Sequence, residues 1–330
     1  MPNLTSAISQ AIRGKIGWNS IAVAISVLIV AIAAITLWRL IHEIEPRQII
    51  AALKAQPPHG IFIACGFVLA GYFMLACYDI FALRVTGWRA VPMRIAAFAS
   101  FTSYTIGHNF GAPVFTSNVL RYRIYSALGL SVVDVARIAF ITGQTYWLGN
   151  MLMLGCGVLY VPAAASAIDH LPASINRVLG ILGLMAVASY LVWLLPRRRV
   201  IGRANWRIVL PTAQMTLVQI VIGTLDLIFV SLAMYVLLPA QPPVGFAELM
   251  VIFVTSMLIG IVSHAPGSLG VIEAAMFIGL AQFQKEQLLA SLLTFRILYF
   301  VGSLCLAALV LGLREFSLLV QGAIKPLWPS

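Results

Sequence analysis

Nine polar or ionisable side chains lie within or beside long apolar stretches, where they could bind charged groups. They are Asp79, Asn109, Arg121, Arg123, Asp226, His264, Glu273, Arg296 and Tyr299. A charged side chain inside a bilayer costs about 2.5 to 3.5 kcal/mol on insertion scales, so such residues usually mark a path for a polar or charged group. We therefore expect a translocation path rather than a catalytic centre, and we assign no catalytic residue.

The acidic candidates differ in the partners that the sequence offers them. Glu273 follows a Pro-Gly break and Arg296 lies in the last apolar stretch. The two could form an ion pair that opens to admit a head group, or a permanent bridge that only fixes helix packing. Asp226 lies near the middle of an apolar stretch. Asp79 lies late in another, where it could belong to the path or simply pair with Arg84.

The arginines suit phosphate, and no motif for another chemistry is present. Arg121 and Arg123 could bind a lipid phosphate through planar, bidentate contacts, or they could be anchors at the inner membrane surface. The helix starts after Pro113 and Pro266 offer unpaired N–H groups to an anion. The sequence has no nucleotide-binding P-loop, zinc-protease motif or Gly-x-Ser-x-Gly turn. We expect neither a metal nor a cofactor.

Two apolar regions, residues 95–128 and 246–283, are interrupted by glycine and proline. The break residues are Gly111 and Pro113 in the first region, and Pro266, Gly267 and Gly270 in the second. Proline removes a backbone donor and glycine frees the backbone, so both sites should end a helix. Broken backbone at membrane depth survives only where protein or a watery cavity satisfies its polar groups. We interpret both regions as re-entrant helical hairpins.

Six further stretches have the length of complete membrane crossings, at about 1.5 Å per residue and a hydrocarbon core of roughly 30 Å. With 61% hydrophobic and 9% charged residues, the chain cannot cover itself with a wetted surface. We predict an all-α polytopic membrane protein, one transmembrane domain over residues 1–330, with about six full spans and two re-entrant hairpins. The predicted spans are Ser20–Ile41, Gly60–Leu83, Ala136–Val161, Ile175–Leu195, Val209–Leu238 and Leu288–Leu313.

The basic residues lie in clusters between apolar stretches, and the formal net charge is +11. This alternation follows the positive-inside rule, so we explain the charge by topology and expect no nucleic-acid partner. The clusters around Arg13 and Arg314 predict cytoplasmic N- and C-termini. By the same rule, the first hairpin opens to the inside and the second to the outside.

The order span, span, broken hairpin, span occurs twice, in approximate halves 18–161 and 174–314. Landmarks at similar offsets are Asp79 and Asp226, Pro113 and Pro266, and Arg137 and Arg296. Each half would hold an odd number of full crossings, so the second half would be inverted relative to the first. Inverted repeats with broken helices are a recurring design of transporters. The sequence therefore favours an inverted repeat.

The breaks and the charges around them also form a recognisable set of motifs. They are Tyr78-Asp79, His108 to Gly111, Val119 to Arg123 with Tyr125, Ser263 to Glu273, and Arg296 with Tyr299. This set resembles the lysylphosphatidylglycerol synthase transmembrane region, the flippase domain of multiple peptide resistance factors and their stand-alone relatives, over residues 60–313. Two departures are Ser268, which replaces a second glycine, and Ala112-Pro113 in the first break.

The resemblance implies a flippase that moves a phospholipid, for example an aminoacylated phosphatidylglycerol, between the leaflets of a bacterial cytoplasmic (inner) membrane. Its partners would be the lipid, a separate lipid-modifying enzyme or a second copy of the chain. No aminoacyl-transferase domain follows Leu313, so we expect a stand-alone relative or the membrane part of a longer protein. The alternative function is a membrane enzyme or accessory subunit acting on lipid-linked glycans or phospholipids, with Glu273 as its carboxylate.

Overall fold

The computed structural model describes residues 46–110, 113–195, 199–203 and 206–323. Within these ranges the chain is almost entirely helical, with one short β-hairpin. The predicted span Ser20–Ile41 and the predicted break residue Gly111 lie outside the described residues.

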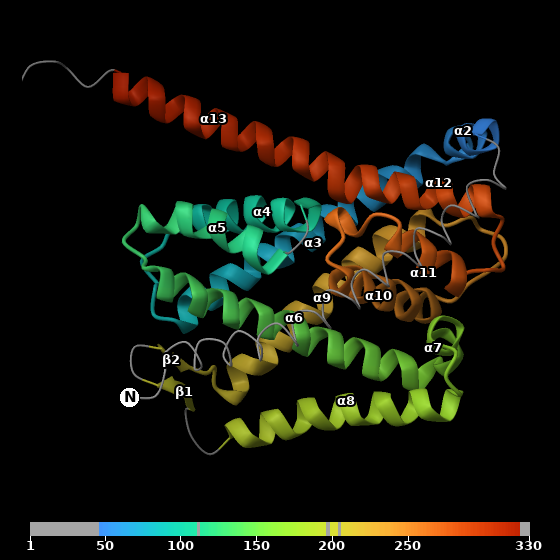
Figure 1. The fold of residues 1–330 in the computed structure, drawn as a ribbon, viewed down its shortest axis with the longest axis horizontal. Helices are drawn as coiled ribbons and strands as arrows, with labels where there is room; N and C mark the ends of the chain where they lie inside the picture. The colour runs from blue at the N-terminus through green and yellow to red at the C-terminus, as the bar shows by residue number, and fades with distance from the viewer. Residues whose placement is uncertain (1–45, 111–112, 196–198, 204–205, 324–330) are drawn as a thin grey trace, which may run out of the picture.

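Figure 1 shows how the elements follow one another along the chain. Their order is α2 (Pro46–Ala55), α3 (Pro58–Val85), α4 (Met93–Phe110), α5 (Pro113–Ser126), α6 (Val132–Tyr160), α7 (Pro162–Asp169), α8 (Ala173–Leu194), β1 (Val200–Arg203), β2 (Trp206–Val209), α9 (Ala213–Leu237), α10 (Phe246–Ser263), α11 (Val271–Gly279), α12 (Lys285–Arg296) and α13 (Ser303–Ala323). A 3-10 turn, Pro266–Ser268, precedes α11, and a π-helical turn, Ile297–Gly302, joins α12 to α13.

Five helical segments in the described chain are long and apolar enough to cross a membrane: α3, α8, α9, α10 and the continuous stretch Lys285–Leu313. Helices α6 and α7 meet at an angle of 104° and together make a sixth candidate. The all-α polytopic class is therefore confirmed. Because α10 is itself long enough for a full crossing, the re-entrant nature of the second hairpin stays a prediction, as does that of the first.

Capping residues set the starts of two spans, and both starts differ from the predicted ones. Helix α6 begins earlier than predicted because Ser131 and Asp134 form a capping box, with the Asp134 N–H donating to the Ser131 hydroxyl (3.2 Å). Helix α9 begins after Thr212, not at Val209. Val209 pairs with Val200 in the antiparallel β1–β2 hairpin, which continues the apolar stretch in extended form.

Both predicted breaks end helices in the structure. Helix α4 ends at Phe110 and α5 begins at Pro113, and the two helices pack against each other. Helix α10 ends at Ser263, the following residue His264 adopts a left-handed conformation (φ 54°), and α11 begins after Gly270 (φ 77°). Helices α10 and α11 also pack together. The broken-helix pairs are therefore present, while the inverted repeat that would relate them remains a prediction.

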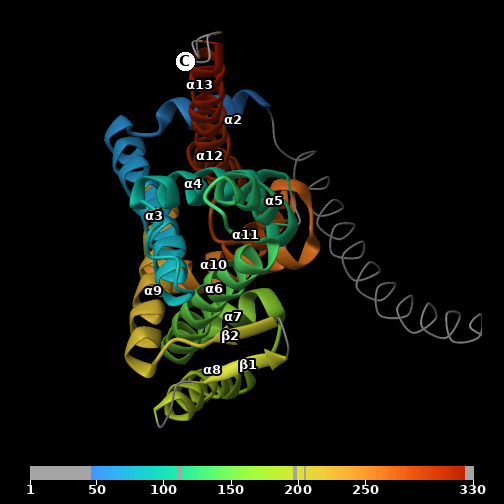
Figure 2. The same ribbon diagram turned by 90° about the vertical axis from the view of Figure 1, so that its left-hand side faces the viewer.

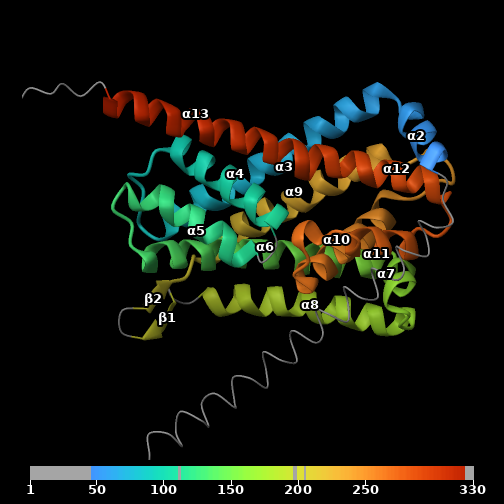
Figure 3. The ribbon, with the colours of Figure 1, turned by 45° about the horizontal axis from the view of Figure 1, so that its top comes forward.

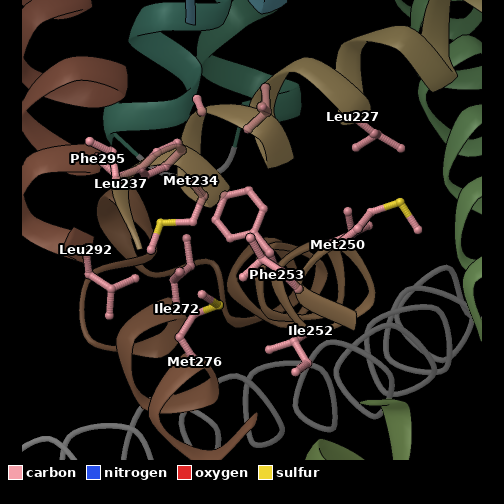
Figure 4. Close-up of a cluster of buried hydrophobic side chains, with 14 of the residues drawn as sticks. Leu227, Met234, Leu237, Met250, Ile252, Phe253, Ile272, Met276, Leu292 and Phe295 are labelled. Carbon is pink, nitrogen blue, oxygen red and sulfur yellow. The ribbon is translucent and has the colours of Figure 1, made fainter. Parts of the chain in front are cut away.

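The main core lies where α3, α9, α10, α11 and α12 meet. Figure 4 shows side chains from α9, α10, α11 and α12 interdigitating around Phe253, which is fully buried. The labelled residues include Leu227 and Met234 of α9, Met276 of α11 and Phe295 of α12. The extensive contact between α3 and α9 brings the first and second halves of the chain together.

Helices α6 and α9 approach so closely that only glycine fits at their crossing. A Cβ added to Gly223 would lie 2.4 Å from the carbonyl oxygen of Thr145, and one added to Gly149 would lie 2.5 Å from the carbonyl carbon of Gly223. The Gln219 Nε2 donates to the Thr145 hydroxyl (2.9 Å) beside this contact. Small residues and polar side chains at a helix crossing are typical of membrane proteins.

The last predicted span is one long rod that extends beyond Leu313. Helix α12, the π-helical turn and α13 run along one edge of the bundle (Figure 3). Figure 2 shows α13 projecting away from the other helices. Helix α4 packs against α13, and α2 packs against α12. Helices α2 and α7 and the β-hairpin were not among the predicted elements.

Candidate functional site

A buried ion pair joins α3 to α5. Arg121 donates two hydrogen bonds to Asp79, from Nε to Oδ2 (2.9 Å) and from Nη2 to Oδ1 (2.8 Å). The Tyr125 hydroxyl donates a third to Oδ2 (2.9 Å), and Arg121 Nη1 donates to Asn118 Oδ1 (2.7 Å). The Asp79 side chain is fully buried and that of Arg121 is 2% exposed. The pair therefore satisfies its own charges inside the protein.

The Asp79–Arg121 pair excludes the alternative that Asp79 pairs with Arg84. Asp79 does not pair with Arg84, because residues five apart on a helix point in different directions. The Arg84 guanidinium lies instead beside Met93 Sδ (4.0 Å). Asp79 thus belongs to a contact between two helices rather than to a local surface pair.

Aromatic side chains connect the Asp79–Arg121 pair to the middle of the molecule. The guanidinium carbon of Arg121 lies 5.1 Å from the centroid of the Tyr104 ring. Tyr104 packs edge-on against Tyr78, with ring centroids 6.3 Å apart. The Tyr78 hydroxyl donates to Oδ2 of Asp226 (3.0 Å). Two aromatic rings therefore link the Arg121 cation to the Asp226 carboxyl.

A second ion pair holds the second break. Arg296 donates from Nε and Nη2 to the Glu273 carboxylate, the latter at 2.8 Å. The same guanidinium donates to the backbone carbonyls of Gly267 (2.9 Å) and Ser268 (3.2 Å). The Gly270 N–H donates to Glu273 Oε2 (2.9 Å). Arg296 therefore satisfies both the buried carboxylate and carbonyls that the broken helix leaves without partners.

The second break lies against the end of α4 and the π-helical turn. Asn109 Nδ2 donates to the carbonyl of Phe300 (3.2 Å) and to that of Thr105 (2.8 Å). A Cβ on Gly267 would lie 3.6 Å from the carbonyl oxygen of Asn109 and 3.9 Å from Nη1 of Arg296. Asn109, Gly267 and Arg296 are therefore brought together from three interrupted helical segments.

Tyr299 lies inside the π-helical turn and is 3% exposed. The ring of His108 stacks on it, with centroids 5.8 Å apart. Tyr72 of α3 donates to the Tyr299 carbonyl (3.0 Å) and to the Ser303 hydroxyl (2.9 Å). A π-helical turn frees backbone groups from the regular helical pattern and is frequent at functional sites.

Asp226 is the third buried carboxyl of the candidate set. It is 5% exposed, and its Oδ1 has no hydrogen-bond partner. Its Oδ2 accepts from Tyr78 alone. Within the described residues it has no ion pair, in contrast to Asp79 and Glu273.

The remaining candidates lie apart from these contacts. Arg123 is exposed. It lies two residues after the buried Arg121, so it points to a different side of α5. His264 is exposed at the end of α10, and its Nδ1 lies 2.8 Å from the Val262 carbonyl oxygen. Pro266 is exposed at the start of the 3-10 turn, and Pro113 is the first residue of α5. The structure does not bring Arg121 and Arg123 to one phosphate site.

Two cavities of the described structure lie away from the candidate residues. One of about 740 Å³ opens between α2, α3, α9 and α12, beside Gln56 and Glu286. The other, about 100 Å³, lies beside Arg84 and Trp88. None of the nine candidates lines either cavity. In this structure four of the charged candidates form two ion pairs, Asp79–Arg121 and Glu273–Arg296. The described residues contain no cluster of three metal-ligating side chains.

Several polar groups that complete the site were not predicted from the sequence. Tyr72, Asn118 and Ser303 hold the ion pair or the π-helical turn in place. The only signal for Tyr72 and Ser303 was a hydroxyl inside an apolar span. Asn118 lies three residues before Arg121 on α5, a spacing that places the two side chains on one helix face.

Comparisons with known proteins find a matching family model and similar proteins. A family model described as the lysylphosphatidylglycerol synthase TM region matches residues 21–307. The chain is 26% identical to the protein slr0712 of Synechocystis sp. over 276 residues, which covers 83% of this chain and 85% of the relative. It is 28% identical to the inner membrane protein YbhN of Escherichia coli over 263 residues, covering 78% and 80% respectively.

Proposed function

Because the chain belongs to the lysylphosphatidylglycerol synthase transmembrane region family, whose members are membrane proteins associated with lipid metabolism or transport, we propose that it moves a phospholipid between membrane leaflets. By analogy with its inner-membrane relative, we place it in a bacterial inner membrane with both termini cytoplasmic. A separate lipid-modifying enzyme would supply or use the lipid, and a second copy of the chain is a further proposed partner.

The observation that carries this proposal is the position of Arg296. Its guanidinium binds Glu273 and the carbonyls of Gly267 and Ser268 at a break between two helices. A planar guanidinium binds a phosphate in the same bidentate manner as a carboxylate. A lipid phosphate that displaces Glu273 would therefore meet a site that is already oriented.

We propose the following exchange. The phosphate of a lipid replaces the Glu273 carboxylate on Arg296 while the acyl chains remain in the bilayer. Glu273 keeps the Gly270 N–H as a donor, which reduces the cost of separating the pair. When the lipid leaves, Glu273 returns to Arg296. Arg121 is engaged by Asp79 and Asn118, so we assign it a supporting role rather than phosphate contact.

The alternative of a membrane enzyme would need a carboxylate that is free to take a proton or attack a substrate. Glu273 accepts hydrogen bonds from both Arg296 and the Gly270 N–H. Its side chain is only 7% exposed. The geometry at Glu273 therefore favours an ion pair over a catalytic base.

The first test identifies the lipid. The wild type and a Glu273→Ala/Arg296→Ala double variant are purified, and their bound lipids are compared by mass spectrometry. One lipid class is expected to be enriched on the wild type and lost from the double variant. If both proteins carry only bulk lipid, Arg296 is not a head-group ligand.

The second test measures movement. A fluorescent derivative of the enriched lipid is placed in proteoliposomes, and its exposure is followed by chemical quenching from outside. Arg296→Gln is expected to slow lipid movement at least about tenfold, because it removes the phosphate-binding charge. The matched control is Arg177→Gln, which removes an exposed arginine of α8 and is expected to leave the rate unchanged. Absence of movement by the wild type would contradict the proposed function.

A further inference from the structure

Asp226 is a buried acidic group whose charge nothing in the described structure neutralises. It is the fourteenth residue of the 25-residue helix α9, far from both helix ends. Its residue exposure is 5%, and Oδ1 has no hydrogen-bond partner. A carboxylate in apolar surroundings is costly unless it is paired with a cation, coordinates a metal or carries a proton.

The other two buried carboxylates of the candidate set provide an internal comparison. Asp79 receives two hydrogen bonds from the Arg121 guanidinium, and Glu273 receives two from that of Arg296. Asp226 receives one hydrogen bond, from the neutral hydroxyl of Tyr78. Among the described residues, a counter-charge therefore accompanies two of these carboxyls but not the third.

The titratable side chains that interact electrostatically with Asp226 are tyrosines. They are Tyr72 and Tyr78 of α3, Tyr146 of α6 and Tyr299 of the π-helical turn. His108, another titratable side chain, stacks on Tyr299. From α8, α10 and α12, which also pack on α9, no described side chain makes a hydrogen bond or ion pair with Asp226.

We propose that Asp226 binds and releases a proton, and that this proton drives the lipid movement proposed above. The coupling part rests on the proposed function, while proton binding stands independently of it. A carboxylic acid at Oδ1 or Oδ2 is neutral and fits the apolar core. Loss of the proton leaves an uncompensated charge, which the core tolerates only if it rearranges or admits water.

A chain of contacts connects Asp226 to the Asp79–Arg121 ion pair. Tyr78 is covalently next to Asp79, so a shift of Tyr78 toward an ionised Asp226 moves the backbone that carries Asp79. Tyr104, in contact with Tyr78, also packs under the Arg121 guanidinium. Deprotonation would therefore act on the α3–α5 ion pair through α3 itself and through one aromatic ring.

Infrared spectroscopy of protein labelled with isotopic aspartate tests the proton directly. The sequence contains only four aspartates, Asp79, Asp134, Asp169 and Asp226. At neutral pH the wild type is expected to show one labelled carboxylic-acid carbonyl band, which disappears at alkaline pH and is missing from Asp226→Asn. No such band in the wild type, or an unchanged band in Asp226→Asn, would overturn proton binding.

If Asp226→Asn does not fold, a second variant, Tyr78→Phe, can still assign the labelled band. Tyr78→Phe removes the hydroxyl that donates to Oδ2, which stabilises the charged form. The labelled band is therefore expected to persist to higher pH in Tyr78→Phe than in the wild type. A band that disappears at the same pH in both proteins would show that it does not belong to Asp226.

Proteoliposomes with a proton gradient test the coupling. One proton per lipid shifts the equilibrium ratio of lipid between leaflets about tenfold for each pH unit. The wild type is expected to accumulate the fluorescent lipid in one leaflet, and Asp226→Asn to distribute it equally. An equal distribution in the wild type, with lipid still moving, would overturn coupling. If the wild type moves no lipid at all, the proposed function and the coupling fail together, and the infrared result still decides whether Asp226 binds a proton.

Discussion

At the scale of single residues, the interior of the protein is organised by charges that are paired across helices. The Asp79–Arg121 pair is nearly inaccessible, and Tyr125 and Asn118 supply its remaining hydrogen bonds. Removing one partner of such a pair leaves the other as an isolated buried charge, which costs far more than the pair itself contributes. The stability of the first half should therefore depend on both partners being present.

We predict that Arg121→Ala lowers the free energy of unfolding by about 3 to 5 kcal/mol, because Asp79 is left buried without a cation. Thermal unfolding in detergent measures the change. The matched control is Arg177→Ala, an exposed arginine of α8, for which a change of about 0.5 kcal/mol or less is expected. Equal losses in the two variants would show that Asp79 does not need Arg121.

Ser268 offers a prediction of the opposite sign. It has a left-handed backbone (φ 49°) that favours glycine. Ser268→Gly should therefore stabilise the protein by about 1 kcal/mol, since the left-handed conformation costs a residue with a Cβ about 1 to 2 kcal/mol. Gly267→Ala, at φ 58°, is the converse control and should destabilise it. A loss of stability in Ser268→Gly, measured by thermal unfolding, would contradict this account.

At the scale of elements, the helix breaks were predictable and the partners of the charges were not. Pro266 and Gly270 predict the second break, because proline and glycine act locally on the backbone. The pairing of Arg121 with Asp79 depends on how α5 packs on α3, which no local pattern encodes. The Glu273–Arg296 contact was anticipated, since both residues are costly inside a membrane without a partner.

Other elements escaped prediction for identifiable reasons. The residues before α9 are apolar, so they extended the predicted span to Val209, although they form a β-strand. The π-helical turn around Tyr299 has no residue signature of its own. Helices α2 and α7 are short, at 10 and 8 residues, and periodicity is a weak signal at that length.

The crossing of α6 and α9 yields a prediction about packing. Gly223→Ala should lower the free energy of unfolding by about 1 to 3 kcal/mol, because its Cβ would collide with the backbone of Thr145 and Gly149. Gly143→Ala on α6 is the control, since nothing lies within 4 Å of its added Cβ. Similar stability of the two variants would mean that the helices separate without cost.

At the scale of the whole molecule, composition and length determined the fold class. A segment that crosses a bilayer must satisfy its own backbone hydrogen bonds, and apolar stretches of about 20 residues have the length of membrane-spanning helices, so the multi-span architecture was predictable. Depth in the bilayer does not follow in the same way, because a helix pair that crosses fully and one that turns back have similar sequences. The side of the membrane to which each break opens is predicted instead from the basic residues around it.

Cysteine labelling addresses that orientation. In a background without the four native cysteines, we predict that Ser268→Cys is labelled from outside and Ala112→Cys from inside, as the charge distribution requires. Intact cells treated with a membrane-impermeant thiol reagent, compared with inverted vesicles, provide the measurement. The opposite labelling pattern would contradict the arrangement of the two hairpins.

The contact between Tyr72 and Ser303 has a consequence for biosynthesis. These side chains are 231 positions apart, so α3 leaves the ribosome long before its partner exists. Asn109 likewise awaits the carbonyl of Phe300, and Glu273 awaits Arg296. A nascent chain lacking this last helical segment would contain three polar side chains, each without one of its partners. Insertion of that helix is then the event that converts a loosely held chain into a finished protein, and chains interrupted before it should be prime substrates for membrane proteases.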